Sequence, residues 1–123
     1  MSKKVLIIED DGADYALIRK SVLDFWPDAI ITHSASMSDT YELLKKNVFH
    51  LILLDLNLED TLGESSVAEL RRFDQRSSVV VLTSMLTDQI VRNCLKYGAN
   101  HVAPKECIGS RMLTEILEQH VKM

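Results

Sequence analysis

The stretch LILLDLN, residues 51–57, decides the fold of this chain. Its first four residues are aliphatic, and an unbroken aliphatic run of this length is typical of a strand buried on both faces of a parallel sheet. The run ends on the carboxylate of Asp55, which is costly to bury without a partner. We therefore expect Asp55 to lie at the end of a central strand, with other groups nearby to compensate its charge.

Further short aliphatic runs have the length of strands, and the segments between them have the periodicity of helices. The expected strands cover residues 5–8, 29–31, 51–54, 79–82 and a shorter segment around 102–103. The expected helices cover residues 17–25, 38–44, 65–73, 87–97 and 110–121. Alternation of strands and helices predicts right-handed βαβ units, and so a doubly wound α/β fold with a parallel sheet between two helical layers.

Polar residues and glycine predict where several helices begin and end. Asp11, Ser38 and Ser110 are expected to be helix N-caps, because their side-chain oxygens can accept hydrogen bonds from free backbone amides. Gly98 is expected just past the end of the fourth helix. The connections are short and include no linker, so we expect residues 1–123 to form one domain.

The composition disfavours several classes of protein. The formal net charge of -4 would repel nucleic acid, and no local basic patch offsets it. No apolar run approaches the roughly 20 residues of a membrane span. Cys94 and Cys107 form no CxxC motif; we expect Cys94 in the core and Cys107 as a partly exposed thiol. We expect a reduced, cytoplasmic chain with neither nucleic acid nor membrane as a direct partner.

Residues that follow the strands bring charged and hydroxyl groups to one edge of the expected sheet, where ligands bind in open parallel sheets. The candidates are Glu9 and Asp10 after the first strand, Asp55 after the third, Thr83 after the fourth and Lys105 after the fifth. Crowded carboxylates repel one another unless a cation lies between them, and Mg2+ prefers oxygen ligands. The pattern therefore predicts a Mg2+ site.

The same residue types suit phosphoryl transfer. Mg2+ held by Asp10 and Asp55, with Glu9 acting through water, would leave one Asp55 oxygen free to attack phosphorus. The metal, the Lys105 ammonium and the Thr83 hydroxyl would stabilise charge on the phosphoryl oxygens. We therefore expect a phosphoryl-transfer site at this edge.

The order and spacing of these motifs resemble the receiver domain of two-component response regulators, the CheY-like superfamily, over nearly the whole chain. The matching motifs are VLIIEDD, LILLDLN, VVVLTSM and HVAPKE. The resemblance implies a flavodoxin-like (βα)5 three-layer sandwich with a five-stranded parallel sheet in the order 2-1-3-4-5. It also implies that Asp55 is the phospho-acceptor, that Asn57 offers its backbone carbonyl to the Mg2+ ion, and that Thr83 and Lys105 contact the phosphoryl group.

The resemblance further implies the partners of the chain. A sensor histidine kinase or a histidine phosphotransfer protein would supply the phosphoryl group from phosphohistidine, which makes the chain a signalling switch and not an enzyme. Phosphorylation would alter a face formed by residues 88–97, Val102 and residues 110–120, which would bind a downstream protein target. Asn57 and Met85 would influence hydrolysis of the acyl phosphate.

Three positions depart from the family pattern. Glu59 stands where the family often has proline, Val102 replaces a common aromatic switch residue, and Pro104 precedes Lys105 where many relatives have a proline after the lysine. These departures leave open a receiver-like module that binds its partner without phosphorylation. A phosphatase of the haloacid dehalogenase type is disfavoured, because it needs an aspartate as general acid where this chain has Asn57.

Overall fold

The computed structural model describes residues 2–60 and 63–120, in which strands and helices alternate as expected. The strands are β1 (Lys4–Ile8), β2 (Ile30–Ser34), β3 (Leu51–Asp55), β4 (Ser78–Thr83) and β5 (His101–Pro104). The helices are α1 (Gly12–Phe25), α2 (Met37–Lys46), α3 (Ser65–Phe73), α4 (Asp88–Lys96) and α5 (Arg111–His120), with a 3-10 helix η1 (Lys105–Cys107) between β5 and α5. Among the helices so described, none is long and apolar enough to cross a membrane.

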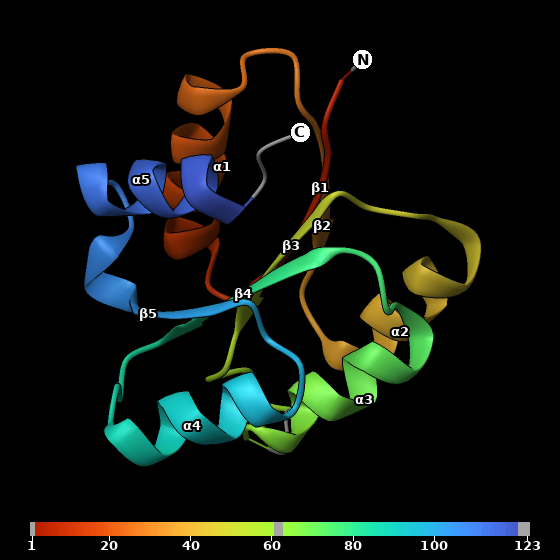
Figure 1. Ribbon diagram of the computed structural model, residues 1–123. Helices are drawn as coiled ribbons and strands as arrows, with labels where there is room; N and C mark the ends of the chain where they lie inside the picture. Colours follow the sequence, from red (N-terminus) through yellow and green to blue (C-terminus); the bar gives the residue numbers. More distant parts are fainter. Residues whose placement is uncertain (1, 61–62, 121–123) are drawn as a thin grey trace.

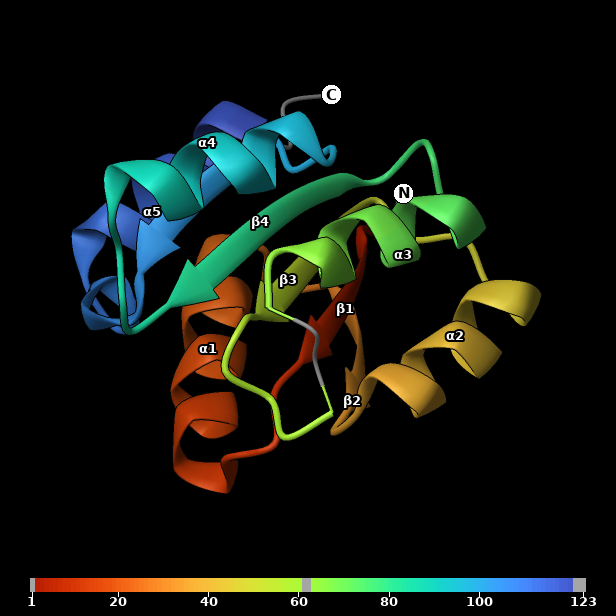
Figure 2. The same cartoon turned by 90° about the horizontal axis from the view of Figure 1, so that it is seen from below.

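The strands form one parallel sheet in the order β2-β1-β3-β4-β5, which confirms the doubly wound, flavodoxin-like fold. Every residue of the central strand β3 is buried, as its aliphatic run predicts. Strand β1 pairs with both β2 and β3, so the order of strand addition reverses beside β1. Figure 2 shows the arrowheads of β1, β3 and β4 pointing toward the same edge. This is the edge at which a ligand site is expected.

Helices cover both faces of the sheet, as Figure 1 shows: α1 and α5 lie on one face, and α2, α3 and α4 on the other. The strands supply side chains to both layers, because successive residues of a strand point to opposite faces. Leu6 and Ile8 of β1 pack in the cluster below α2, α3 and α4, whereas Val5 and Ile7 pack in the cluster below α1 and α5. Two buried layers therefore hold the central strands in place.

Two expectations about burial and strand length were wrong. The second strand covers residues 30–34 and not 29–31, because β2 is an edge strand that is not buried on both faces and includes polar residues. Cys107 was expected to be partly exposed, but it is buried in η1 beneath α5. Cys94 lies in the core on the opposite face, as predicted.

The helix ends confirm most of the predicted caps. The Asp11 carboxylate accepts hydrogen bonds from the backbone amides of residues 13 and 14, so Asp11 caps α1. Ser110 accepts a hydrogen bond from the backbone amide of residue 112, and Gly98 has a φ of 117° just past α4. Ser38 is not the N-cap of α2; Ser36 is, because its hydroxyl accepts a hydrogen bond from the amide of residue 39 at 3.1 Å. Residue 121, expected to end α5, lies outside the described residues.

Candidate functional site

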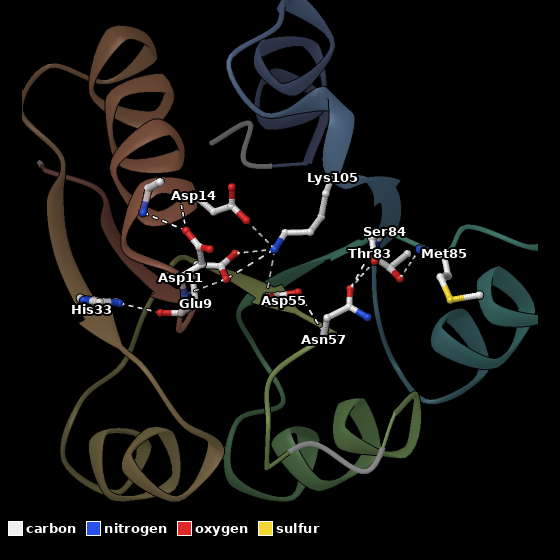
Figure 3. A network of polar contacts seen from close by, with 11 residues as sticks. Glu9, Asp11, Asp14, His33, Asp55, Asn57, Thr83, Ser84, Met85 and Lys105 are labelled. Carbon is white, nitrogen blue, oxygen red and sulfur yellow. Dashed lines mark hydrogen bonds and ion pairs between the residues drawn. The ribbon is translucent and has the colours of Figure 1, made fainter.

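The carboxyl ends of β1, β3 and β5 bring carboxylates and an ammonium together, as Figure 3 shows for Glu9, Asp55 and Lys105. Glu9 follows β1, Asp55 ends β3, and Lys105 follows β5 directly. Glu9 is 0% exposed and Asp55 is 2% exposed, whereas Asp10 is exposed. Carboxylate oxygens of Glu9, Asp10 and Asp55 all lie within 4.8 Å of one another. The fold thus assembles the acidic cluster that the sequence predicts.

Neighbouring backbone groups hold Glu9 in this cluster. Its amide donates a hydrogen bond to the carbonyl of Ser34 at 2.9 Å, and its carbonyl accepts one from Nε2 of His33 at 2.8 Å. The amide of Asp11 donates to Glu9 Oε2 at 3.2 Å. The other oxygen, Oε1, is buried without a hydrogen-bond partner among the described residues, although Lys105 Nζ lies 3.2 Å away as an ion pair. One side of the Glu9 carboxylate is therefore poorly satisfied.

This arrangement raises the pKa of both Glu9 and Lys105. Burial, followed by the hydrogen bond and the charge of Asp55, raises the pKa of Glu9 from 4.5 to about 7. Burial by itself lowers the pKa of Lys105, but the hydrogen bond to Asp14 and the charges of Asp55 and Glu9 outweigh it and raise that pKa. Lys105 therefore remains a cation, while the charge of Glu9 is incompletely compensated.

Two donors orient the Asp55 carboxylate. The backbone amide of Asn57 donates to Asp55 Oδ1 at 2.9 Å, and Lys105 Nζ lies 3.3 Å from Asp55 Oδ2. The Asn57 side chain makes contacts that were not predicted: its Oδ1 accepts hydrogen bonds from the amide and the hydroxyl of Ser84, both at 3.1 Å. These bonds join the loop after β3 to the loop after β4. Asn57 therefore links the segment that carries Asp55 to the segment that follows Thr83.

Thr83 ends β4 at the same edge, one strand from Asp55, and is buried. Its Oγ1 accepts a hydrogen bond from the amide of Met85 at 3.1 Å, a turn that Figure 3 shows beside Ser84. The structure thus places the expected hydroxyl at the site edge. The hydrogen bond from the Met85 amide to this hydroxyl also orients the first residues after β4.

Sequence reasoning missed one residue that contacts this cluster. Asp14 Oδ2 lies 2.8 Å from Lys105 Nζ, closer than the oxygens of Glu9 at 3.2 Å and Asp55 at 3.3 Å. Its one signal in the sequence is its place three residues after the Asp11 cap, in the first turn of α1. Acidic residues are common there because they complement the helix dipole, so the signal does not single out Asp14.

The loops after β3 and β5 and the residue Val102 can be compared with the family pattern in the described structure. Gly63, which keeps the family glycine in the loop after Asp55, has a φ of 63°, and residues 61–62 of that loop lie outside the described residues. The bond between Lys105 and Glu106 is trans. Val102 is partly buried and packs against the core cluster below α2, α3 and α4.

Known proteins with related sequences include transcriptional regulators. The profile of the response regulator receiver domain family matches residues 5–118. The glycerol metabolism activator of Pseudomonas putida is 27% identical over 94% of this chain and 52% of its own length. This chain therefore spans about half the length of that relative.

Solved structures show the same fold. A two-component response regulator from Clostridium difficile superposes with a TM-score of 0.87 at 19% identity, over 98% of this chain and 97% of that one. The phosphorylated cyanobacterial phytochrome response regulator RcpA superposes with a TM-score of 0.85 at 21% identity, over 99% of this chain and 96% of that one. Because the family profile covers nearly the whole chain and the fold and acidic edge agree with it, this chain belongs to the receiver domain family of two-component response regulators.

Proposed function

We propose that Asp55 is the phospho-acceptor of this receiver domain and that residues 1–123 act as one signalling module. One observation carries the assignment: Asp55 ends the central strand, is 2% exposed, and contacts Lys105 from within the acidic cluster of Glu9, Asp10 and Asp55. A buried carboxylate with an adjacent ammonium suits a nucleophile whose product carries additional negative charge. The phosphorylated state of the structural relative RcpA is consistent with this role.

A Mg2+ ion would be held by Asp10, Asp55 and the backbone carbonyl of Asn57, with Glu9 acting through water. The observed donor set fits such an ion, because carboxylate oxygens are hard ligands and those of Glu9, Asp10 and Asp55 lie within 4.8 Å of one another. The buried Glu9 Oε1, which lacks a hydrogen-bond partner among the described residues, and the raised pKa of Glu9 both indicate charge that a cation would compensate. When bound, the ion neutralises charge on phosphoryl oxygens.

In the proposed reaction an Asp55 oxygen attacks the phosphorus atom of a phosphohistidine. An O–P bond forms, the P–N bond of the donor breaks, and its electron pair stays on the imidazole nitrogen. The Asn57 amide orients the carboxylate, and Lys105 lies close enough to neutralise one phosphoryl oxygen. Thr83 would donate its hydroxyl hydrogen to another. The chain changes its own Asp55 and no separate substrate, so we describe it as a switch.

The phosphoryl donor in this proposal is a sensor histidine kinase or a histidine phosphotransfer protein, and the receptor of the signal is a downstream protein. The side chains of Leu95 in α4, Tyr97 at its end and Met112 in α5 are apolar and exposed, and these residue types suit a protein contact. The net charge of -4 favours a protein partner over direct contact with nucleic acid. We place this phosphoryl transfer in the cytoplasm, where such kinases deliver the phosphoryl group.

Intact-mass measurement after incubation with Mg2+ and phosphoramidate tests the assignment of Asp55. The wild type should gain one phosphoryl group, and either Asp55→Asn or a chelator should prevent the gain, because the nucleophile or the metal is then missing. Asp24→Asn is the matched control, since Asp24 lies on the exposed side of α1 and pairs with Lys20. Normal labelling of Asp55→Asn would refute the assignment. An unmodified wild type would favour the phosphorylation-independent binding module.

A further inference from the structure

Three carboxylates share the ammonium of Lys105, and the shortest contact is to Asp14, which has no place in the acceptor and metal cluster. The Lys105 Nζ atom lies 2.8 Å from Asp14 Oδ2, 3.2 Å from Glu9 Oε1 and 3.3 Å from Asp55 Oδ2. Figure 3 shows the ammonium between Asp14 on α1 and Asp55 on β3. Lys105 is thus held toward α1 as well as toward the acceptor.

The local structure of α1 leaves the Asp14 carboxylate available for this contact. The backbone amide of Asp14 donates to Asp11 Oδ1 at 3.0 Å, which fixes the first turn of the helix. An acidic residue three positions after a cap often bonds back to the amide of the cap residue. Here Glu9 Oε2 already accepts that hydrogen bond from Asp11 at 3.2 Å. Asp14 is therefore free to reach Lys105.

The three carboxylate partners of Lys105 differ in whether a cation bound in the acidic cluster would compensate their negative charge. An ammonium has three N–H donors, and the Lys105 ammonium lies within 3.3 Å of oxygens of three carboxylates. Glu9 and Asp55 belong to the acidic cluster that suits a cation, whereas Asp14 does not. A cation in the cluster would weaken the attraction of Glu9 and Asp55 for Lys105. Asp14 would then be the carboxylate that competes with an incoming phosphoryl group for the ammonium.

We infer that Asp14 is a positioning residue that holds Lys105 toward α1 and thereby lowers the rate at which Asp55 is phosphorylated. This inference rests on the proposed function. The transferring group needs an N–H donor from Lys105, so the ammonium must move away from Asp14 as negative charge gathers on the phosphoryl oxygens. The Asp14 side chain is 36% exposed, and water screens the pair, so the effect is moderate.

Asp14→Asn tests the inference, because the amide keeps an oxygen acceptor and removes the charge. The measurement is the second-order rate constant for phosphorylation by phosphoramidate at saturating Mg2+, followed by intact mass. We expect the constant to rise about two- to five-fold, the range that corresponds to loss of one exposed ion pair. Asp14→Glu keeps the charge and should restore a rate near that of the wild type.

Asp24→Asn is the matched control for the change in net charge. Asp24 lies on the same helix and pairs with Lys20 at 2.8 Å, so its substitution should leave the rate unchanged. A merely structural role for Asp14 predicts a slower reaction and a lower melting temperature, which is the opposite sign for the rate.

The possible failures are distinguishable. If the wild type is labelled at Asp55 but Asp14→Asn is no faster, the inference is wrong and the proposed function stands. An equal acceleration in Asp24→Asn also overturns the inference, because it points to net charge alone. A wild type that accepts no phosphoryl group overturns both.

Discussion

Glu9 carries an electrostatic cost that the fold alone does not explain. Its side chain is 0% exposed, and its Oε1 atom lacks a hydrogen-bond partner among the described residues. Burial and the nearby Asp55 carboxylate raise its pKa to about 7, although Lys105 compensates part of the charge. A glutamine of similar size would avoid this cost. The cation that we propose for this cluster would compensate this cost, whereas the packing of β1 does not require a carboxylate.

The raised pKa of Glu9 predicts a pH dependence of stability in the metal-free protein. Because the pKa is about 7 in the folded state and 4.5 in the reference state, the folded state binds the proton more tightly. The contribution to the free energy of unfolding is thus fully present below pH 4.5 and is lost as the pH rises through about 7. The total loss is roughly 3 kcal/mol at most.

Urea unfolding with a chelator present, at about pH 5 and about pH 8, measures this dependence. Glu9→Gln should remove most of the loss, because the amide does not titrate. The stability gained by Glu9→Gln over the wild type should therefore grow with pH. A gain of equal size at both pH values would contradict the assignment of the titration to Glu9.

Among the connections, those at the amino ends of the strands are tied together by Arg71 of α3. Its guanidinium donates hydrogen bonds to the carbonyl of Gly98 at 2.9 Å, the carbonyl of Ser77 at 2.8 Å and the side-chain oxygen of Asn100 at 3.0 Å. These contacts hold the end of α3, the start of β4 and the turn between α4 and β5. Arg71 therefore ties α3 to the start of β4 and to the turn between α4 and β5, at the edge opposite the acidic site.

Gly98→Ala should weaken this connection. Gly98 has a φ of 117°, and an added Cβ atom would lie 2.8 Å from Arg71 Cγ, so both backbone strain and a side-chain clash are expected. We expect a loss of about 1–3 kcal/mol in the free energy of unfolding, measured by urea denaturation. Gly12→Ala is the control, because Gly12 lies in α1 and an added Cβ meets nothing within 4 Å.

Gly12→Ala should leave stability unchanged or raise it by up to about 1 kcal/mol, since alanine restricts the unfolded chain. Equal losses in the two variants would show that neither the conformation of Gly98 nor its contact with Arg71 matters.

The fold as a whole gathers negatively charged carboxylates at the carboxyl edge of β1 and β3, beside the point where the strand order reverses. The two apolar clusters bury the strands on both faces, and Glu9, Asp10 and Asp55 meet at the carboxyl edge that they create. Binding of a cation to this edge in the folded state alone stabilises the whole domain by mass action. Metal binding and global stability are therefore linked.

Saturating Mg2+ should raise the melting temperature of the wild type. At a concentration 100 times the dissociation constant the stabilisation is about 2.7 kcal/mol. Asp10→Ala should remove this increment by deleting a ligand, whereas Asp24→Ala, on the exposed side of α1, should retain it. The check is thermal unfolding with Mg2+ and with chelator. Melting curves that do not respond to Mg2+ in the wild type would exclude the metal site.

Aliphatic runs and helical periodicity were sufficient to predict the doubly wound sheet, because burial on both faces excludes polar residues from β3 and its neighbours. The same reasoning predicted β2 but gave it the wrong bounds, because an edge strand tolerates polar side chains. The order of Glu9, Asp55, Thr83 and Lys105 along the chain was enough to predict which side chains share an edge, since parallel strands all end on one side. Local pattern therefore determined the architecture and most of the residues that lie together at this edge.

Contacts between elements distant in the sequence depended on packing. Ser36 and not Ser38 caps α2, and the amide of Ser38 instead donates to Asp60, a residue of the distant loop after β3. Asp14 in the first turn of α1 contacts Lys105, the residue that follows β5, and no local sequence pattern records a contact between segments so far apart in the chain. Sequence periodicity records which residues are buried and where backbone amides are capped. Which charged side chains pair with one another is decided by the packing of the helices on the sheet, because it depends on the relative positions of whole elements.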